Sequence, residues 1–177
     1  MVTGLTRFRN ALERLLEAWL VVMVVAMTAV VVFAVVWRKA GASFIWYDEV
    51  AAIILAWITY YGAALAALKR AHIGFDGILL ALPMRWRMLA VAVSEALVFL
   101  FFIVLAWTGW TVLGVLQGMS LISLPWVPVQ FTQSVIPIGA VLFIVCEALS
   151  LPEYLKLVRS GVSHDQRAVT EQAQEVE

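Results

Sequence analysis

Two glutamates, Glu95 and Glu147, lie within long apolar runs and are the residues best placed for chemistry in this sequence. A carboxylate inside hydrocarbon is costly, so it is a candidate for a proton or cation site or for an ion pair. Glu95 is expected about two turns into its run, roughly 10 Å along a helix, paired with a basic residue of a neighbouring helix. Glu147 is expected to reach the interface or to meet Lys156. Structural pairing is therefore the predicted role of both.

The sequence offers little for metal, redox or nucleic-acid chemistry. His72 and His164 are far apart, and the single Cys146 cannot form a disulfide within the chain. Zinc sites and two-histidine haem sites need more ligands than this set provides. The 12 basic residues are balanced by 12 acidic ones and form no basic stripe for a nucleic acid. We therefore expect no enzyme activity, no cofactor, no metal and no nucleic-acid partner.

The composition indicates a membrane protein. Hydrophobic residues make up 64% of the 177 residues, charged residues make up 14%, and the mean hydropathy is +0.96. Globular proteins are about 45–50% apolar and about 25% charged, and a soluble fold of this length could not bury the excess. Unbroken apolar runs predict helices rather than barrel strands. The expected fold class is an all-α integral membrane protein with four transmembrane helices plus interfacial amphipathic segments.

Four runs are long enough to cross a bilayer, which needs roughly 20 apolar residues. The expected spans cover about residues 18–37, 50–68, 88–116 and 129–149, within a four-helix membrane domain over 18–151. Residues 1–17 are expected to form an amphipathic segment that lies at the headgroups or extends the first span. A further in-plane segment is expected between spans two and three. Residues 152–177 are expected to be a cytoplasmic tail.

The positions of Lys and Arg predict the orientation. Ten of the twelve cationic residues fall in the N-terminal segment, the connection between spans two and three, and the tail. Only Arg38 and Lys39 fall on the opposite side. An excess of cations marks the cytoplasmic side, so both termini are expected in the cytoplasm. A cleaved signal peptide is disfavoured, because the charged segment and the apolar run at the N-terminus are both too long.

Span two has the features of a helix that docks along a partner. Its outer end carries aromatic and acidic residues, its middle carries small residues, and its inner end is basic. Small residues permit close helix approach. Helix capping, anchoring at the interface and packing within this chain would explain the same residues without a partner. The candidate interface residues are Trp46, Asp48, Glu49, Trp57, Gly62, Ala63, Lys69, Arg70, His72 and Asp76.

An ordered set of motifs from Trp46 to Pro83 resembles a known family. The set comprises Trp46-Tyr47-Asp48-Glu49, then Trp57 with Gly62-Ala63, then Lys69-Arg70-Ala71-His72-Ile73 with Asp76, and finally Leu82-Pro83. It is similar to the small membrane subunit of tripartite ATP-independent periplasmic (TRAP) transporters. The chain length and the four spans fit the same family, whereas the sequence outside this stretch has only general membrane character.

The resemblance implies a non-catalytic small permease subunit in the bacterial inner membrane. In the family, a large membrane subunit carries the sodium and substrate sites, and the small subunit packs against its static part. A periplasmic substrate-binding protein delivers an organic acid. The implied partners are therefore the large TRAP membrane subunit, the binding protein and the lipid bilayer. The chain itself lacks the inverted repeats, broken helices and midplane polar cluster typical of a complete secondary transporter.

Two alternatives stay open. The chain could be a small homo-oligomeric exporter with Glu95 as its coupling acid, in which case it should transport without a partner. It could instead be the membrane-anchor subunit of an oxidoreductase. Axial haem histidines must project from spans, whereas His72 falls in a connection and His164 in the tail, so the second alternative is the weaker one.

Overall fold

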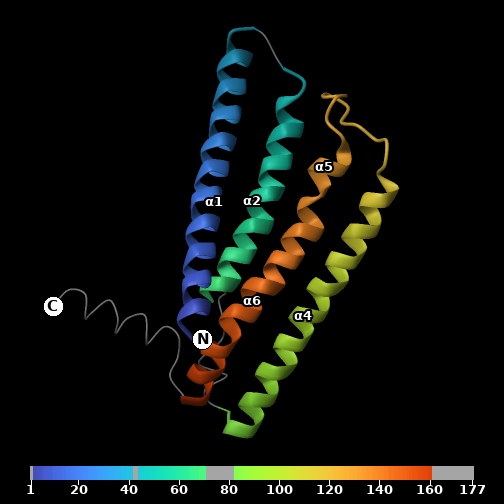
Figure 1. The fold of residues 1–177 in the computed structure, drawn as a ribbon. Helices are drawn as coiled ribbons and strands as arrows, with labels where there is room; N and C mark the ends of the chain where they lie inside the picture. Colours follow the sequence, from blue (N-terminus) through green and yellow to red (C-terminus); the bar gives the residue numbers. More distant parts are fainter. Residues whose placement is uncertain (1, 42–43, 71–81, 161–177) are drawn as a thin grey trace, which may run out of the picture.

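The computed structural model describes residues 2–41, 44–70 and 82–160 (Figure 1). In these residues the helices are α1 (Val2–Lys39), α2 (Tyr47–Lys69), α4 (Met84–Val115), α5 (Val129–Gln133) and α6 (Val135–Ser160). Four stretches are long and apolar enough to cross a membrane, namely Thr6–Lys39, Tyr47–Lys69, Met84–Val115 and Val129–Ser160. The predicted all-α fold with four spanning helices is confirmed. The expected in-plane segment and most of the expected tail lie outside the described residues.

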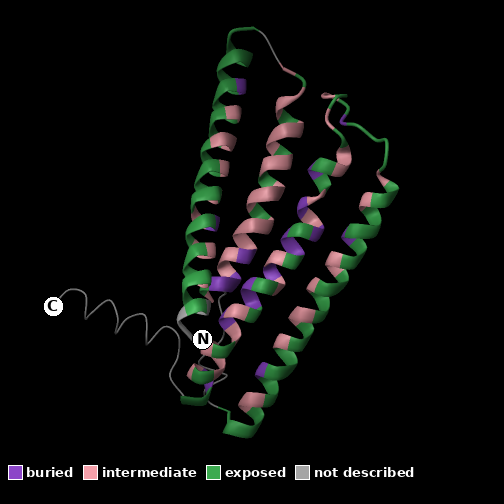
Figure 2. Cartoon of the chain, viewed as in Figure 1, coloured by how far each residue is buried: buried purple, intermediate pink, exposed green. Residues whose placement is uncertain are grey.

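The long helices lie side by side in the order α1, α2, α6 and α4 (Figure 1). Helix α2 packs against α1 and α6, and α4 packs against α6. Helix α6 is therefore central although it comes last in the chain, and burial is concentrated on it and on the adjoining part of α2 (Figure 2). The edge helices α1 and α4 leave many large apolar side chains exposed, as expected for surfaces that face lipid or a partner.

A hydrophobic core forms near the end that holds the start of α1 and the end of α2. This end, at the bottom of Figure 1, is called the inner end because the cation distribution predicts that it faces the cytoplasm. Phe102 of α4 stacks on Phe143 of α6 with ring centroids 3.6 Å apart, which joins α4 to the core. The buried core residues are Leu16, Ala64, Ala67, Leu68, Phe143 and Cys146.

Glycines set two of the closest helix contacts. A Cβ added at Gly139 of α6 would lie 2.8 Å from the Cβ of Tyr60 on α2. A Cβ added at Gly109 of α4 would lie 3.1 Å from atoms of Ile136 and Pro137. A larger residue at 139 would force Tyr60 to shift, and one at 109 would press on Ile136 and Pro137, so both glycines permit close helix approach.

The N-terminal segment is part of the first helix and not a separate element. Helix α1 runs without a break from Val2 to Lys39, so residues 1–17, apart from the undescribed Met1, extend the span. Leu16 is buried in the core and Leu12 packs against it. Part of the apolar side of this segment is therefore covered by residues of α2 and α6.

The fourth span begins at Val129 and extends past residue 149 at its inner end. Its helix is interrupted at Ser134, between α5 and α6. Pro137 has no N–H and its ring crowds the carbonyl four residues earlier, which accounts for the break. At the inner end, α6 continues through Pro152 to Ser160. The first residues of the expected tail, 152–160, are thus helical.

Candidate functional site

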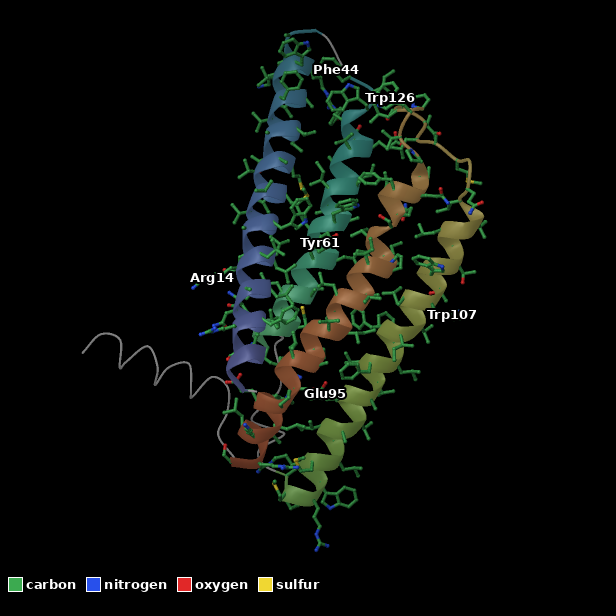
Figure 3. All side chains as sticks on the ribbon, viewed as in Figure 1. Arg14, Phe44, Tyr61, Glu95, Trp107 and Trp126 are labelled. Atoms are coloured by element: carbon green, nitrogen blue, oxygen red, sulfur yellow. The ribbon has the colours of Figure 1, made fainter. Side chains whose placement is uncertain are left out.

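A buried charge cluster joins three helices at the inner end. Arg70 Nη1 lies 2.6 Å from Glu95 Oε1 of α4 and 2.9 Å from Glu147 Oε1 of α6. Arg70 Nε donates to Ser150 Oγ at 2.9 Å, and the guanidinium carbon lies 4.4 Å from the centre of the Tyr154 ring. Arg70 is thus the common partner of groups on α4 and α6, and Glu95 lies where α4 faces α6 (Figure 3).

The backbone at Arg70 explains how the side chain reaches this position. Arg70 is the C-cap of α2, with φ 52° and ψ 32°, and its N–H donates to the carbonyls of Ala66 and Ala67. This left-handed conformation is normally occupied by glycine and costs other residues roughly 1–2 kcal/mol. The ion pairs, the hydroxyl contact and the ring contact of the side chain offset that cost.

The cluster is buried in the protein itself. The exposed fractions of the side chains are 14% for Arg70, 13% for Glu95 and 6% for Glu147. The predicted pairing of Glu95 with a basic residue of a neighbouring helix is confirmed. Because α4 begins at Met84, Glu95 lies about three turns into its helix rather than two. Glu147 does not reach toward Lys156 but shares Arg70 with Glu95, which the sequence reasoning missed.

A more exposed set of ion pairs ties α1 to its neighbours. Lys69 Nζ contacts Glu17 and lies 3.3 Å from Glu13 Oε1, both on α1. Arg9 of α1 pairs with Glu153 of α6 and donates to the Leu68 carbonyl at 3.3 Å. These side chains are about a quarter to a half exposed, so each pair contributes little stability alone.

At the outer end, Glu49 holds the connection between α4 and α5. Its carboxylate accepts hydrogen bonds from the Ser123 hydroxyl, from Ser123 N at 3.0 Å and from Ile122 N at 3.4 Å. Trp57 Nε1 donates to the Thr132 carbonyl at 3.1 Å. Glu49 and Trp57, predicted as candidates for contact with a partner, therefore have partners within the chain.

The other predicted interface residues divide into two groups. Trp46 lies beside Phe44, with ring centroids 5.7 Å apart, and Ala63 packs against the core. In contrast, Asp48 is exposed, and no described residue places an atom within 4 Å of a Cβ added at Gly62. His72 and Asp76 lie outside the described residues.

Asp48 and Gly62 belong to one continuous side of α2. Ala52, Leu55 and Thr59 lie on the same side at intervals of three and four residues, and all three are exposed. We call Asp48, Ala52, Leu55, Thr59 and Gly62 the open face of α2. It lies away from Ala64 and Ala67, which are fully buried. The open face consists mostly of small residues and has no covering helix in the described part of the chain.

No metal site is found among the residues that the structure describes. Within these residues, no three His, Cys, Asp or Glu side chains come together in a way that could hold a metal ion.

A comparison with family models identifies the chain. The model described as tripartite ATP-independent periplasmic transporters, DctQ component, matches residues 27–156. This match includes all of α2, α4 and α5, most of α6, and the three charged residues of the buried cluster. No curated protein matches the sequence. The family match confirms the resemblance found in the sequence, and the chain belongs to the DctQ component family of TRAP transporters.

Proposed function

We propose that this chain is the non-catalytic small permease subunit that scaffolds the large membrane subunit of its TRAP transporter. In this complex, sodium drives the uptake of an organic acid, and a periplasmic binding protein delivers the acid. Both termini lie in the cytoplasm and the chain crosses the bacterial inner membrane. Beside the family match, the observation that carries the scaffold role is the open face of α2.

Gly62 is the strongest support for docking along this face. A glycine in the middle of a helix costs about 0.5–1 kcal/mol relative to alanine. In the part of the chain that the structure describes, nothing lies within 4 Å of the position that a Cβ would take at Gly62, so no contact seen there requires a glycine. Close approach of a helix from another subunit would require it.

The contacts of the polar groups within the spans also favour a scaffold role for this chain over a role in binding the transported substrate or ion. Glu95 and Glu147 are engaged by Arg70, and Glu49 is engaged by the outer connection. A substrate or ion site needs convergent polar groups that are free to bind. These carboxylates are already bound by groups of the same chain. This supports the proposal that the substrate and ion sites lie on the large subunit.

The test is co-purification of the large subunit with a tagged form of this chain. We expect Gly62→Leu to reduce the yield of the large subunit more than about tenfold, equivalent to about 1.4 kcal/mol, and to abolish uptake. The matched control is Gly114→Leu on α4, because Gly114 is also helical and also has nothing within 4 Å of an added Cβ. The melting temperature of each isolated variant shows whether it still folds.

Two outcomes would contradict the proposal in different ways. Yields at the wild-type level from Gly62→Leu would place the partner surface elsewhere, with the apolar groove beside Trp107, Trp110 and Pro137 as the next candidate. Transport by the purified chain alone in proteoliposomes would support the exporter hypothesis instead.

A further inference from the structure

The positive and negative charges of the Arg70, Glu95 and Glu147 cluster do not balance. One guanidinium faces two carboxylates, and both carboxylates use an oxygen to contact the same nitrogen, Arg70 Nη1. If all three groups were ionised, the cluster would carry a net charge of −1. A net charge held at such low exposure carries a large desolvation penalty.

The neutral neighbours cannot supply the missing positive charge. Ser150 accepts from Arg70 Nε and donates to the Glu147 carbonyl at 3.0 Å. Tyr154 presents its ring to the guanidinium. A hydroxyl or an aromatic ring stabilises a cation without adding one.

Within residues 2–41, 44–70 and 82–160, no cation other than Arg70 forms an ion pair with Glu95 or Glu147. From α2, Lys69 contacts two glutamates of α1. From α1, Arg9 pairs with Glu153 of α6. From α4, Arg87 donates to the carbonyls of Leu82 and Val158 at 3.3 Å. From α6, Lys156 is exposed and lines a groove together with Arg9 and Glu153.

Two polar atoms of the cluster, one acceptor and one donor, are unpaired. Neither Glu95 Oε2 nor Arg70 Nη2, both buried, has a hydrogen-bond partner among the residues that the structure describes. Two carboxylates that share one site resist simultaneous ionisation, and one of them keeps its proton at a pH where an isolated carboxyl has lost it. A protonated carboxyl also gains a donor that can satisfy a neighbouring carboxylate oxygen.

We propose that the Arg70, Glu95 and Glu147 cluster binds one proton, which is held on one of the two carboxyl groups and makes the buried cluster neutral. The proton is a structural ligand that joins α4 and α6 to the end of α2. It belongs to the pair of glutamates and not to either residue alone. This site goes beyond the scaffold role, and neither depends on the other.

Infrared difference spectroscopy on the full chain in lipid nanodiscs tests this assignment, because the C=O stretch of a protonated carboxyl is resolved from that of a carboxylate. We expect wild-type protein at neutral pH to show one such band. Glu95→Gln and Glu147→Gln should each abolish it, since either change leaves a balanced pair with Arg70. Glu153→Gln is the control and should leave the band unchanged, because Glu153 pairs with Arg9.

The wild-type spectrum alone can overturn the proposal, even if a variant fails to fold. Absence of a protonated-carboxyl band at neutral pH would show that the cluster is ionised. A band that appears only after His72→Gln would identify His72 as the missing cation. Loss of the band in only one of the two glutamine variants would indicate an isolated protonated glutamate and would also reject a proton shared by the pair.

Discussion

Gly139 of α6 lies so close to Tyr60 of α2 that a Cβ at position 139 would meet the Tyr60 Cβ at 2.8 Å. Contacts at this distance do not occur between side chains, so the two helices can pack here only because residue 139 is glycine. This contact lies between the helix that carries the open face and the central helix of the row. It therefore helps to fix how the open face of α2 is presented.

The first prediction concerns this contact. Gly139→Ala should destabilise the chain by about 1–3 kcal/mol, the usual range for overpacking a close contact. Thermal unfolding in detergent measures the effect. Gly114→Ala is the control, because an added Cβ there meets nothing within 4 Å and alanine favours the helix. Equal melting temperatures for both variants would show that α2 and α6 can separate without loss of stability.

The second prediction compares two adjacent cations at the end of α2. Arg70→Met should cost about 3–5 kcal/mol, because it leaves buried carboxylates without their cation. Lys69→Met should cost about 0–1 kcal/mol, because its ion pairs with Glu13 and Glu17 are partly exposed. Unfolding of both variants in the same detergent gives the comparison. A larger effect from Lys69→Met would contradict the assignment of Arg70 as the main link among α2, α4 and α6.

The third prediction concerns the outer connection. Glu49→Ala removes the acceptor for Ser123 N and Ile122 N, so these two amides should exchange hydrogen faster. Asp48→Ala is the control, because Asp48 is exposed on the open face, about 100° around the helix from Glu49. Hydrogen exchange followed by mass spectrometry of the peptide that contains residues 117–128 measures the difference. Unchanged exchange in Glu49→Ala would mean that the backbone bonds of the connection hold it without Glu49.

The fourth prediction concerns orientation. A cysteine introduced at the exposed Gln117 should react with a membrane-impermeant maleimide from the periplasmic side, whereas one introduced at Ser160 should react only from the cytoplasm. The native Cys146 is fully buried and should remain unlabelled. Labelling of Gln117→Cys only from the cytoplasm would reverse the predicted topology.

A fifth prediction follows from the ion pairs of Glu95. Glu95→Gln should leave uptake and assembly largely intact, because Arg70 retains Glu147 and the amide can still hydrogen-bond. Uptake by the assembled complex gives the measurement. Loss of uptake with normal assembly would support Glu95 as a coupling acid.

Much of the fold could be predicted from the sequence because crossing a bilayer is a local requirement. A span needs roughly 20 apolar residues, and its backbone must be satisfied within the segment. Both conditions can be checked run by run along the chain, so the four spans and their class were predicted. The motif set from Trp46 to Pro83 was likewise sufficient for the family, since it depends on residue order alone.

The candidate site needed the tertiary structure because it depends on which helices are neighbours. All four spans are apolar enough to lie in lipid, so hydrophobicity does not select their partners. Helix α6 separates α2 from most of α4, and this order follows from close contacts such as Gly139 with Tyr60. Only that arrangement brings Glu95 and Glu147 to one guanidinium, turns Glu49 and Trp57 inward, and leaves Gly62 open. The sequence determined that buried charges must be paired, and the packing of the helices decided which charged groups form the pairs.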